Sequence, residues 1–288
     1  MGWLPSRPHT DASSSAEAED SAVAALRALL AARAVDAGDR LAVDAGDLSR
    51  SDLIRFLRAR KLHLGKSADF LIADLTWRRD CRIKERSAED GAAVLGCDLT
   101  KLQAILPHAS GGVDRQGRPL LFKHFGGQCE IRKMLKDTTL RNMEDYNWWL
   151  NERHVRRLDE LGQVQWIVII DAKNWSPTLF DSTAYKFLKS MAKIDSDHYP
   201  ERLGGMVVVN APAALAFCWR VVRTWLDEAT RDKVEIFSSG DGRRARETLL
   251  RMADPSELPE QYCGSAAPLA AWPAWPARSG LPAPKAGA

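Results

Sequence analysis

Few residues of this 288-residue sequence have the types and spacing that catalysis requires. The segment from Ser238 to Gly242 follows a β-rich run and precedes a helical run, which is the position of a loop that cradles phosphate. An ordinary strand-to-helix turn with an Asp or Ser cap explains the same residues and is the preferred interpretation. His124 and His198 have neither a neighbouring serine nucleophile nor a second metal ligand, which favours packing or surface roles.

The sequence signatures of common α/β enzymes are absent. There is no GxSxG hydrolase elbow, no HExxH zinc motif, no P-loop and no complete GxGxxG. The five cysteines are scattered, odd in number and without any CxxC pair, so neither a disulfide framework nor a zinc site is indicated. The sequence therefore predicts a protein without catalytic activity, metal or cofactor.

The composition indicates in which compartment we expect the protein and which kinds of partner its charge permits. The hydrophobic fraction of 45% is enough for a buried core. The longest apolar runs resemble Trp166 to Ile170, far shorter than the roughly 18 to 20 residues of a membrane-spanning helix. The N-terminus lacks the basic and then apolar pattern of a secretory signal, so we expect a cytoplasmic protein. A net charge of +3 permits attraction to an anionic membrane surface and does not require nucleic acid.

Two kinds of segment make up the middle of the chain. Residues 47–97 carry apolar side chains at helical spacing and predict a small helical module. From residue 112 onward, β-rich runs alternate with segments of helical length, which predicts an α/β domain with a largely parallel sheet, because parallel strands need helical crossovers. The β-rich runs are residues 119–125, 164–170, 206–209 and 234–237.

The two ends of the chain differ in composition from the middle. Residues 1–46 are rich in Ala, Ser, Asp and Gly, and we expect a flexible leader in which residues 24–34 could form a short helix. Residues 266–288 repeat Pro, Ala and Trp, and we expect a disordered tail because proline interrupts helices and central strands. The expected domains are a leader at 1–46, a helical subdomain at 47–97, an α/β domain at 98–265 and a tail at 266–288.

An unusually apolar helix is expected at residues 213–226. Its apolar side chains cover more than half of the helix circumference, and only Arg220 and Arg223 interrupt them strongly. Such a helix is either buried on two sides, or it covers a cavity and touches a membrane, where Trp is favoured at the interface. The residues alone favour burial and leave the second possibility open.

Several short motifs occur in the order found in the CRAL-TRIO lipid-binding family, which the sequence resembles from about residue 48 to 265. They are FLRARK at 56–61, WRR at 77–79, GRP at 117–119, ID at 170–171, YPERL at 199–203, NAP at 210–212, LD at 226–227, Lys233 and LPEQY at 258–262. The resemblance implies a helical N-terminal subdomain packed on a mixed, largely parallel β-sheet lobe with a hydrophobic pocket. It also implies that residues 213–226 are the gating helix of that pocket.

Within the family, the sequence is most similar to the phosphatidylinositol transfer branch. The resemblance implies a headgroup site in which Arg and Lys neutralise phosphate, Thr donates to phosphate oxygen and Glu accepts from inositol hydroxyls. The implied headgroup residues are Arg60, Lys61, Glu201, Thr230 and Lys233. The implied pocket and gate residues are Leu121, Trp166, Val168, Phe217, Trp219, Val222 and Trp225.

One departure from that branch bears on a second ligand. Where the branch offers hydroxyl side chains to phosphatidylcholine, this sequence has Leu121, Trp166 and Val168. This difference predicts that a second ligand is more apolar than phosphatidylcholine, or that there is none. The family also ends in LPxxYGG, whereas this chain has Cys263 after the tyrosine.

The function that the resemblance implies is non-covalent binding of a phospholipid, with phosphatidylinositol favoured, and its transfer between membranes or presentation to another protein. We expect a monomer that visits membrane surfaces transiently, with a lipid kinase as a candidate partner. One alternative is a lipid-sensing scaffold or regulator without transfer. Another is a carrier of a sterol, tocopherol-like or retinoid ligand, against which the charged headgroup residues argue.

Overall fold

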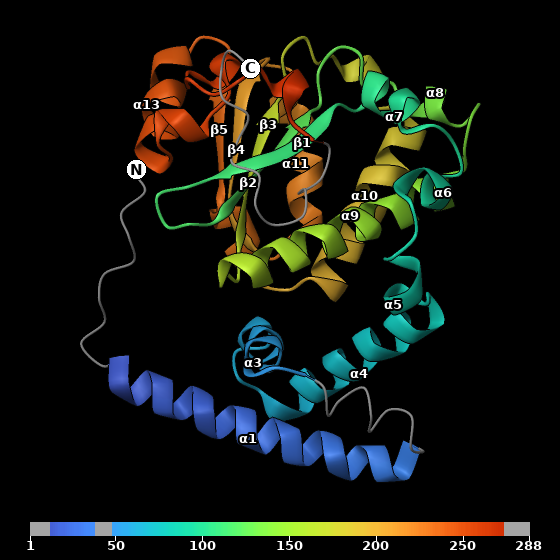
Figure 1. Cartoon of the computed structure of the whole chain (residues 1–288), viewed down its shortest axis with the longest axis vertical. Coiled ribbons are helices and arrows are strands. Elements are labelled where there is room, and N and C mark those ends of the chain that lie inside the picture. Colours follow the sequence, from blue (N-terminus) through green and yellow to red (C-terminus); the bar gives the residue numbers. More distant parts are fainter. Residues whose placement is uncertain (1–11, 38–47, 274–288) are drawn as a thin grey trace. The chain divides into compact units, whose positions relative to one another are not determined.

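The structure, a computed structural model, describes residues 12–37 and 48–273 and divides into two compact units, Met1–Arg82 and Ile83–Ala288 (Figure 1). The division comes earlier than the expected boundary at residue 97. The reason is that the segment after Ile83 packs against the long helix α9 of the second unit, where the indole Nε1 of Trp149 donates to the Glu89 carbonyl oxygen at 3.1 Å.

The described part of the first unit is helical. It consists of α1 (Ala12–Ala37), α3 (Arg50–Ala59) and α4 (Leu64–Asp80). Leucines from α3 and α4 form its centre, since Leu53, Leu57 and Leu71 are fully buried. The helical module predicted for this part of the chain is present.

The expectation of a flexible leader is wrong for residues 12–37. Helix α1 packs against α3 and α4 because one of its faces carries apolar side chains at helical spacing. An ion pair of 2.7 Å between Glu19 and Arg58 adds to this contact. Residues 1–11 and 38–47 of the expected leader lie outside the described residues. The buried side chains of α1 are Val23, Leu26 and Leu30.

The second unit contains a five-stranded sheet in the order β1-β2-β3-β4-β5. Strands β1 and β2 are antiparallel and all other neighbours are parallel, so the predicted mixed, largely parallel sheet is confirmed. The sequence analysis did not predict β1, whose glycine-rich sequence has no clear alternation. The strands are β1 (His108–Val113), β2 (Pro119–His124), β3 (Trp166–Asp171), β4 (Leu203–Ala211) and β5 (Val234–Ser238).

Helices connect these strands and cover the sheet (Figure 1). The α-helices are α5 (Ile83–Arg86), α6 (Gly91–Leu95), α7 (Leu99–Ile105), α8 (Ile131–Met134), α9 (Leu140–Leu161), α10 (Ser182–His198), α11 (Leu215–Val222), α12 (Glu228–Asp232) and α13 (Gly242–Met252). The short 3-10 helices are η1 (Pro177–Leu179), η2 (Arg223–Trp225), η3 (Pro255–Glu257), η4 (Glu260–Tyr262) and η5 (Leu269–Ala271).

Side chains alternate between the two faces of the sheet, as the period of a β-strand requires. On one face, Phe122, Ile169 and Val207 pack with α13 and the C-terminal segment in an apolar core. On the opposite face, Leu121 and Val168 point toward the layer that contains α9, α10 and α11. We call these the core face and the pocket face.

The expectation of a disordered tail is wrong for residues 266–273. Trp272 packs over Gly111, where a Cβ atom would lie 2.4 Å from the indole, and its ring meets Phe122 edge to face at 5.5 Å. The Trp272 Nε1 donates to the Ala267 carbonyl oxygen at 2.9 Å. A buried indole with a satisfied N–H offsets the poor helix propensity of this proline-rich segment. Residues 274–288 lie outside the described residues.

Candidate functional site

Glu201 and Lys233, two of the implied headgroup residues, lie beside each other in the second unit. Glu201 precedes β4 and Lys233 precedes β5, and these strands are parallel neighbours, so both residues lie at the same edge of the sheet. The Lys233 Nζ is 3.5 Å from the Glu201 Oε2, and both side chains are about one quarter exposed. The pair therefore offers a cation and an acceptor that a ligand can reach.

The backbone of Glu201 is in the left-handed region, with a φ of 60°. The Glu201 carbonyl oxygen accepts a hydrogen bond of 3.2 Å from the Gln165 side chain, which helps to hold this turn. A left-handed conformation is costly for a residue other than glycine, and such conformations are concentrated at functional sites. The left-handed turn therefore restricts the position of the Glu201 carboxylate.

Thr230 is close in sequence to Lys233 but its hydroxyl is already engaged. It donates to the Asp227 carboxylate at 2.7 Å, and the Thr230 backbone N–H donates to the same carboxylate at 2.9 Å. Burial raises the pKa of Asp227, but the hydrogen bonds from Thr230 outweigh it and leave that pKa below its usual value. In this conformation Asp227 caps the start of α12 by accepting from Thr230, so donation of the Thr230 hydroxyl to a phosphate oxygen requires that it leave Asp227.

Arg60 and Lys61 belong to the first unit. The Arg60 guanidinium lies over the Phe70 ring, 3.6 Å from its centroid, and donates to the Ala59 carbonyl oxygen at 3.1 Å. Lys61 has a φ of 51°, a left-handed conformation like that of Glu201. The role of Arg60 and Lys61 in headgroup binding stays a prediction.

Two of the implied pocket residues form part of a row across the pocket face. Leu121 pairs with Val168, which pairs with Met206, so their side chains point to the same side of the sheet. Leu121 and Val168 are at most 5% exposed. Trp166 starts β3 and its ring lies 5.9 Å from the ring of His154 on α9. These residues give the pocket face an apolar floor.

Helix α11 and the following turn η2 occupy the centre of the segment expected to be the gate. Cys218 and Val222 pack on the pocket face beside β4, whereas Phe217 is 62% exposed. The Trp225 ring meets the Tyr185 ring of α10 edge to face at 5.1 Å. The segment thus has an apolar inner side and an apolar residue on its outer side.

The remaining gate residues fit this description. Trp219 and Val222 are partly buried, and Arg220 and Arg223 are exposed. An amphipathic helix with Trp and Arg on accessible surface is suited to a membrane interface. The apolar helix predicted for this segment is present. It is not buried on two sides, because several of its residues are exposed.

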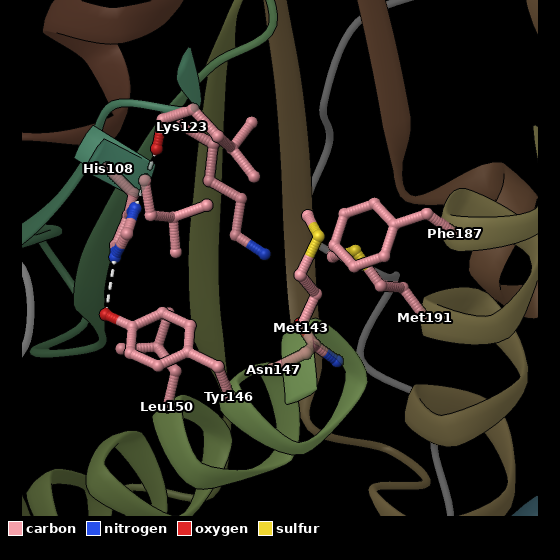
Figure 2. A pocket seen from close by; sticks show the side chains of 10 residues that line it. His108, Lys123, Met143, Tyr146, Asn147, Leu150, Phe187 and Met191 are labelled. Carbon is pink, nitrogen blue, oxygen red and sulfur yellow. Dashed lines mark hydrogen bonds between the residues drawn. The ribbon is translucent and has the colours of Figure 1, made fainter. Parts of the chain in front are cut away.

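A small cavity lies in the layer between the pocket face and the helices α7, α9 and α10 (Figure 2). Its volume is about 30 Å³, within about 390 Å³ of empty space that is partly open to solvent. That volume holds about two water molecules and is far too small for two acyl chains. Enclosing a phospholipid therefore requires that covering elements move. The cavity is lined by Leu102, Leu106, His108, Lys123, Met143, Tyr146, Asn147, Leu150, Phe187 and Met191.

Polar residues of this cavity were missed by the sequence analysis. The His108 Nδ1 donates to the Leu106 carbonyl oxygen at 2.9 Å, and its Nε2 accepts from the Tyr146 hydroxyl at 2.9 Å. Burial lowers the pKa of His108 to about 4, so the ring is neutral at pH 7. Lys123, which neighbours His108 across β1 and β2, directs its ammonium into the cavity. Alternation along β2 could have indicated that Lys123 shares a face with Leu121.

Two other sequence features can be placed. The Asp241 carboxylate accepts from the Ser238 hydroxyl at 2.7 Å and from the Ser238 backbone N–H at 3.2 Å, which supports the strand-to-helix turn rather than a phosphate loop. Across residues 12–37 and 48–273, no group of His, Cys, Asp and Glu is arranged to hold a metal ion. None of the helices within those ranges is long and apolar enough to cross a bilayer.

The pocket face, its apolar floor and the amphipathic helix over it define a class of α/β domain that encloses an apolar ligand. A family comparison agrees with this class. The chain belongs to the CRAL/TRIO family, because the family's model, described as CRAL/TRIO domain, matches residues 109–264.

Named relatives share most of this chain. Phosphatidylinositol/phosphatidylcholine transfer protein SFH9 of Arabidopsis thaliana is 30% identical over an alignment of 232 residues, and the match covers 74% of this chain and 36% of that protein. CRAL-TRIO domain-containing protein YKL091C of Saccharomyces cerevisiae is 29% identical over 231 residues, covering 76% of this chain and 71% of that protein. This chain thus spans little more than a third of the plant relative. A crystal structure of Sfh5 has the same fold, with a TM-score of 0.67, 17% identity and coverage of 89% and 91% of the two chains.

Proposed function

We propose that this protein binds phosphatidylinositol without covalent chemistry and transfers it between membranes or presents it to another protein. The observation that carries the proposal is the pair of Glu201 and Lys233 at one edge of a sheet whose pocket face is apolar. Lys233 can neutralise the phosphodiester, and Glu201 can accept from inositol hydroxyls. Relatives named as phosphatidylinositol/phosphatidylcholine transfer proteins support the same class of ligand.

Within the second unit, Thr230 adds a hydroxyl to the proposed headgroup site once it leaves Asp227. None of these residues requires a cofactor other than the bound lipid. The proposed protein is therefore a carrier and not an enzyme.

The pocket face supplies the energetic reason for a carrier. A phospholipid with about thirty methylenes costs roughly 20 kcal/mol or more to expose to water, at about 0.8 kcal/mol for each methylene. Contact with an apolar floor such as Leu121 and Val168 removes most of that cost. Because the cavity of about 30 Å³ does not hold two chains, α11 is the element proposed to move and admit them.

The exposed side of α11 is the proposed membrane contact. Phe217 can enter the interface while Arg220 and Arg223 meet anionic headgroups, an attraction worth about 1 kcal/mol for each basic residue near the surface. The proposed location is the cytoplasm, with transient visits to membranes as a monomer. A lipid kinase that receives the presented lipid is the proposed partner class, and nucleic acid is not.

The test is transfer of fluorescent phosphatidylinositol from donor to acceptor vesicles by the wild-type protein and by Lys233→Ala. We expect wild-type transfer and a loss of about tenfold or more in the variant, because a charge-assisted hydrogen bond contributes about 1.5–3 kcal/mol. Lys186→Ala, which removes an exposed lysine of α10, serves as the matched control. Lipid binding without transfer would support the sensing alternative. Unchanged transfer by Lys233→Ala would remove this residue from the site.

A further inference from the structure

Lys123 is an unusual residue for the inside of an apolar layer. It lies on the pocket face of β2, and Figure 2 shows its ammonium pointing into the space bounded by side chains of α9 and α10. Among the described residues, Lys123 makes neither a hydrogen bond nor an ion pair. Lys123 is partly exposed, and its ammonium faces a cavity that is partly open to solvent, so a ligand can reach a cation that lies among apolar side chains without an ion-pair partner.

The acidic residue whose charge acts on Lys123 is Asp195 of α10, and its carboxylate already accepts hydrogen bonds from other residues. Its Oδ1 accepts hydrogen bonds from the Asn147 Nδ2 at 3.2 Å and from the Asn151 Nδ2 at 2.7 Å. Burial raises the pKa of Asp195, which favours its neutral form, while the Lys123 charge opposes this shift. The charges of Asp195 and Lys123 therefore influence each other, but no ion pair joins the two residues.

Neither His108 nor His154 accepts a hydrogen bond from Lys123. Both ring nitrogens of His108 already have partners, and burial keeps that ring neutral. His154, one turn beyond Asn151 on α9, is 2% exposed, and neither of its ring nitrogens has a hydrogen-bond partner in the described part of the chain. Burial lowers the pKa of His154 well below its usual value. The interior thus contains the two His154 ring nitrogens, which no described residue satisfies, and such groups in a folded protein call for a specific explanation such as a ligand.

The size and lining of the cavity indicate what the ligand looks like. About two water volumes of space beside Lys123 suit a carboxylate, which is much smaller than an inositol phosphate. The remaining lining is apolar, and Met143 and Met191 have flexible side chains that can move aside for an alkyl chain. The Asn147 amide has a second N–H that can join Lys123 as a donor.

We propose that the cavity beside Lys123 is a binding site for a long-chain fatty acid, with the carboxylate held by the Lys123 ammonium and the Asn147 amide. The alkyl chain follows the apolar side chains of α7, α9 and α10. This site differs from the phosphatidylinositol headgroup site at Glu201 and Lys233. It rests on the proposed function only in that both ligands are lipids.

The experiment is calorimetric titration of the full chain with oleate and with methyl oleate, both below their aggregation limits. We expect the wild-type protein to bind oleate about ten- to one-hundredfold more tightly than the ester, because the ester cannot form the charge-assisted hydrogen bonds. The Lys123→Met variant removes this preference, and the Lys186→Met control keeps it. Equal affinities for acid and ester in the wild-type protein, or a preference that survives Lys123→Met, would overturn the proposal.

Three further measurements separate the explanations. Thermal unfolding of Lys123→Met is expected to give an unchanged or higher melting temperature, since a cation without an ion-pair partner is removed from a largely apolar layer; a fall would indicate a structural role and contradict the proposal. Acetate that binds as tightly as oleate would show a small-anion site and exclude the fatty acid. Phosphatidylinositol transfer by the same variants is measured in parallel. Loss of transfer in Lys233→Ala with intact oleate binding distinguishes the two sites.

Discussion

The two faces of the sheet differ in whether the polar groups beside them have hydrogen-bond partners among the described residues. On the core face, Phe122 stacks on Tyr262 at 5.3 Å and meets Trp272 at 5.5 Å, and the surrounding residues are apolar and buried. On the pocket face, the buried His154 ring has no hydrogen-bond partner among the described residues, the partly exposed Lys123 points into the cavity, and α11 leaves Phe217 exposed. The same strands therefore border a packed apolar core on one side and a layer that contains an unsatisfied polar side chain on the other.

This difference indicates that the core face mainly stabilises the fold and that the pocket face mainly binds ligand. Apolar packing on the core face supplies free energy of folding, in proportion to the apolar area that it removes from water. Unsatisfied polar groups on the pocket face reduce the free energy of unfolding, and natural proteins retain such groups mainly where they bind or react. The comparison predicts that substitutions on the core face affect stability, whereas those on the pocket face affect ligand binding.

The largest expected effect is on the core face. Phe122→Ala should lower the free energy of unfolding by about 3–5 kcal/mol, because the ring is fully buried between two aromatic side chains. Urea unfolding followed by circular dichroism measures this change. A loss below about 1 kcal/mol would show that the core face is not the stable side of the sheet.

Acid should destabilise the pocket face through His108. Its pKa of about 4 in the folded protein lies below the unfolded value of 6.5, so the unfolded state binds more protons between these values. Stability is therefore complete above about pH 6.5 and falls as the pH drops toward 4, by up to about 3 kcal/mol from this group. Unfolding midpoints measured from pH 7 to pH 4 test this.

A variant isolates the contribution of His108 from that of its neighbours. Asp195 acts in the opposite direction, because burial raises its pKa and its protonation favours the folded state. In His108→Asn the loss of stability between pH 6.5 and pH 4 should shrink by about the amount assigned to His108. An identical pH profile in the variant and the wild-type protein would contradict a neutral buried His108.

Membrane exchange should depend on the indoles of the gate. The double variant Trp219→Ser and Trp225→Ser should slow lipid exchange severalfold, since Trp side chains favour the membrane interface. The two side chains are partly exposed, so the unfolding free energy should change less than in Phe122→Ala. Stopped-flow transfer between vesicles gives the rate. Exchange at the wild-type rate would mean that α11 is not the gate.

The smallest expected effect on stability is at the headgroup pair. Glu201→Gln removes a partly exposed ion pair of 3.5 Å, which contributes at most about 1 kcal/mol to folding. The same change should weaken phosphatidylinositol binding while leaving binding of a lipid without inositol hydroxyls unchanged. Vesicle binding with and without phosphatidylinositol measures the difference, and equal losses for both lipids would exclude a role of Glu201 in recognising inositol.

Local patterns predicted much of the second unit. The β-rich run predicted at 164–170 overlaps β3, a segment of helical length between two β-rich runs forms α9, and the apolar segment at 213–226 contains α11. These elements carry strong periodicity and clear ends, such as Thr139, which caps α9 through its side chain. The motif order further implied the neighbourhood of Glu201 and Lys233, which the structure brings to 3.5 Å.

Long-range contacts decided what the sequence did not predict. Strand β1 has the sequence HASGGV, and only pairing with β2 and packing of Trp272 over Gly111 explain it. The three buried apolar residues of α1, Val23, Leu26 and Leu30, stand among alanines, so their burial depends on the facing helices. Lys123, Asp195 and His154 come from three separate elements, and their proximity follows from the fold rather than from spacing.

We propose that the protein carries one phosphatidylinositol molecule. Native mass spectrometry of the protein after incubation with vesicles of phosphatidylinositol and phosphatidylcholine measures this stoichiometry. We expect a one-to-one complex with the mass of phosphatidylinositol, which Lys233→Ala diminishes and Lys186→Ala does not. A protein that acquires no phospholipid, or that binds phosphatidylinositol equally well in both variants, would contradict it.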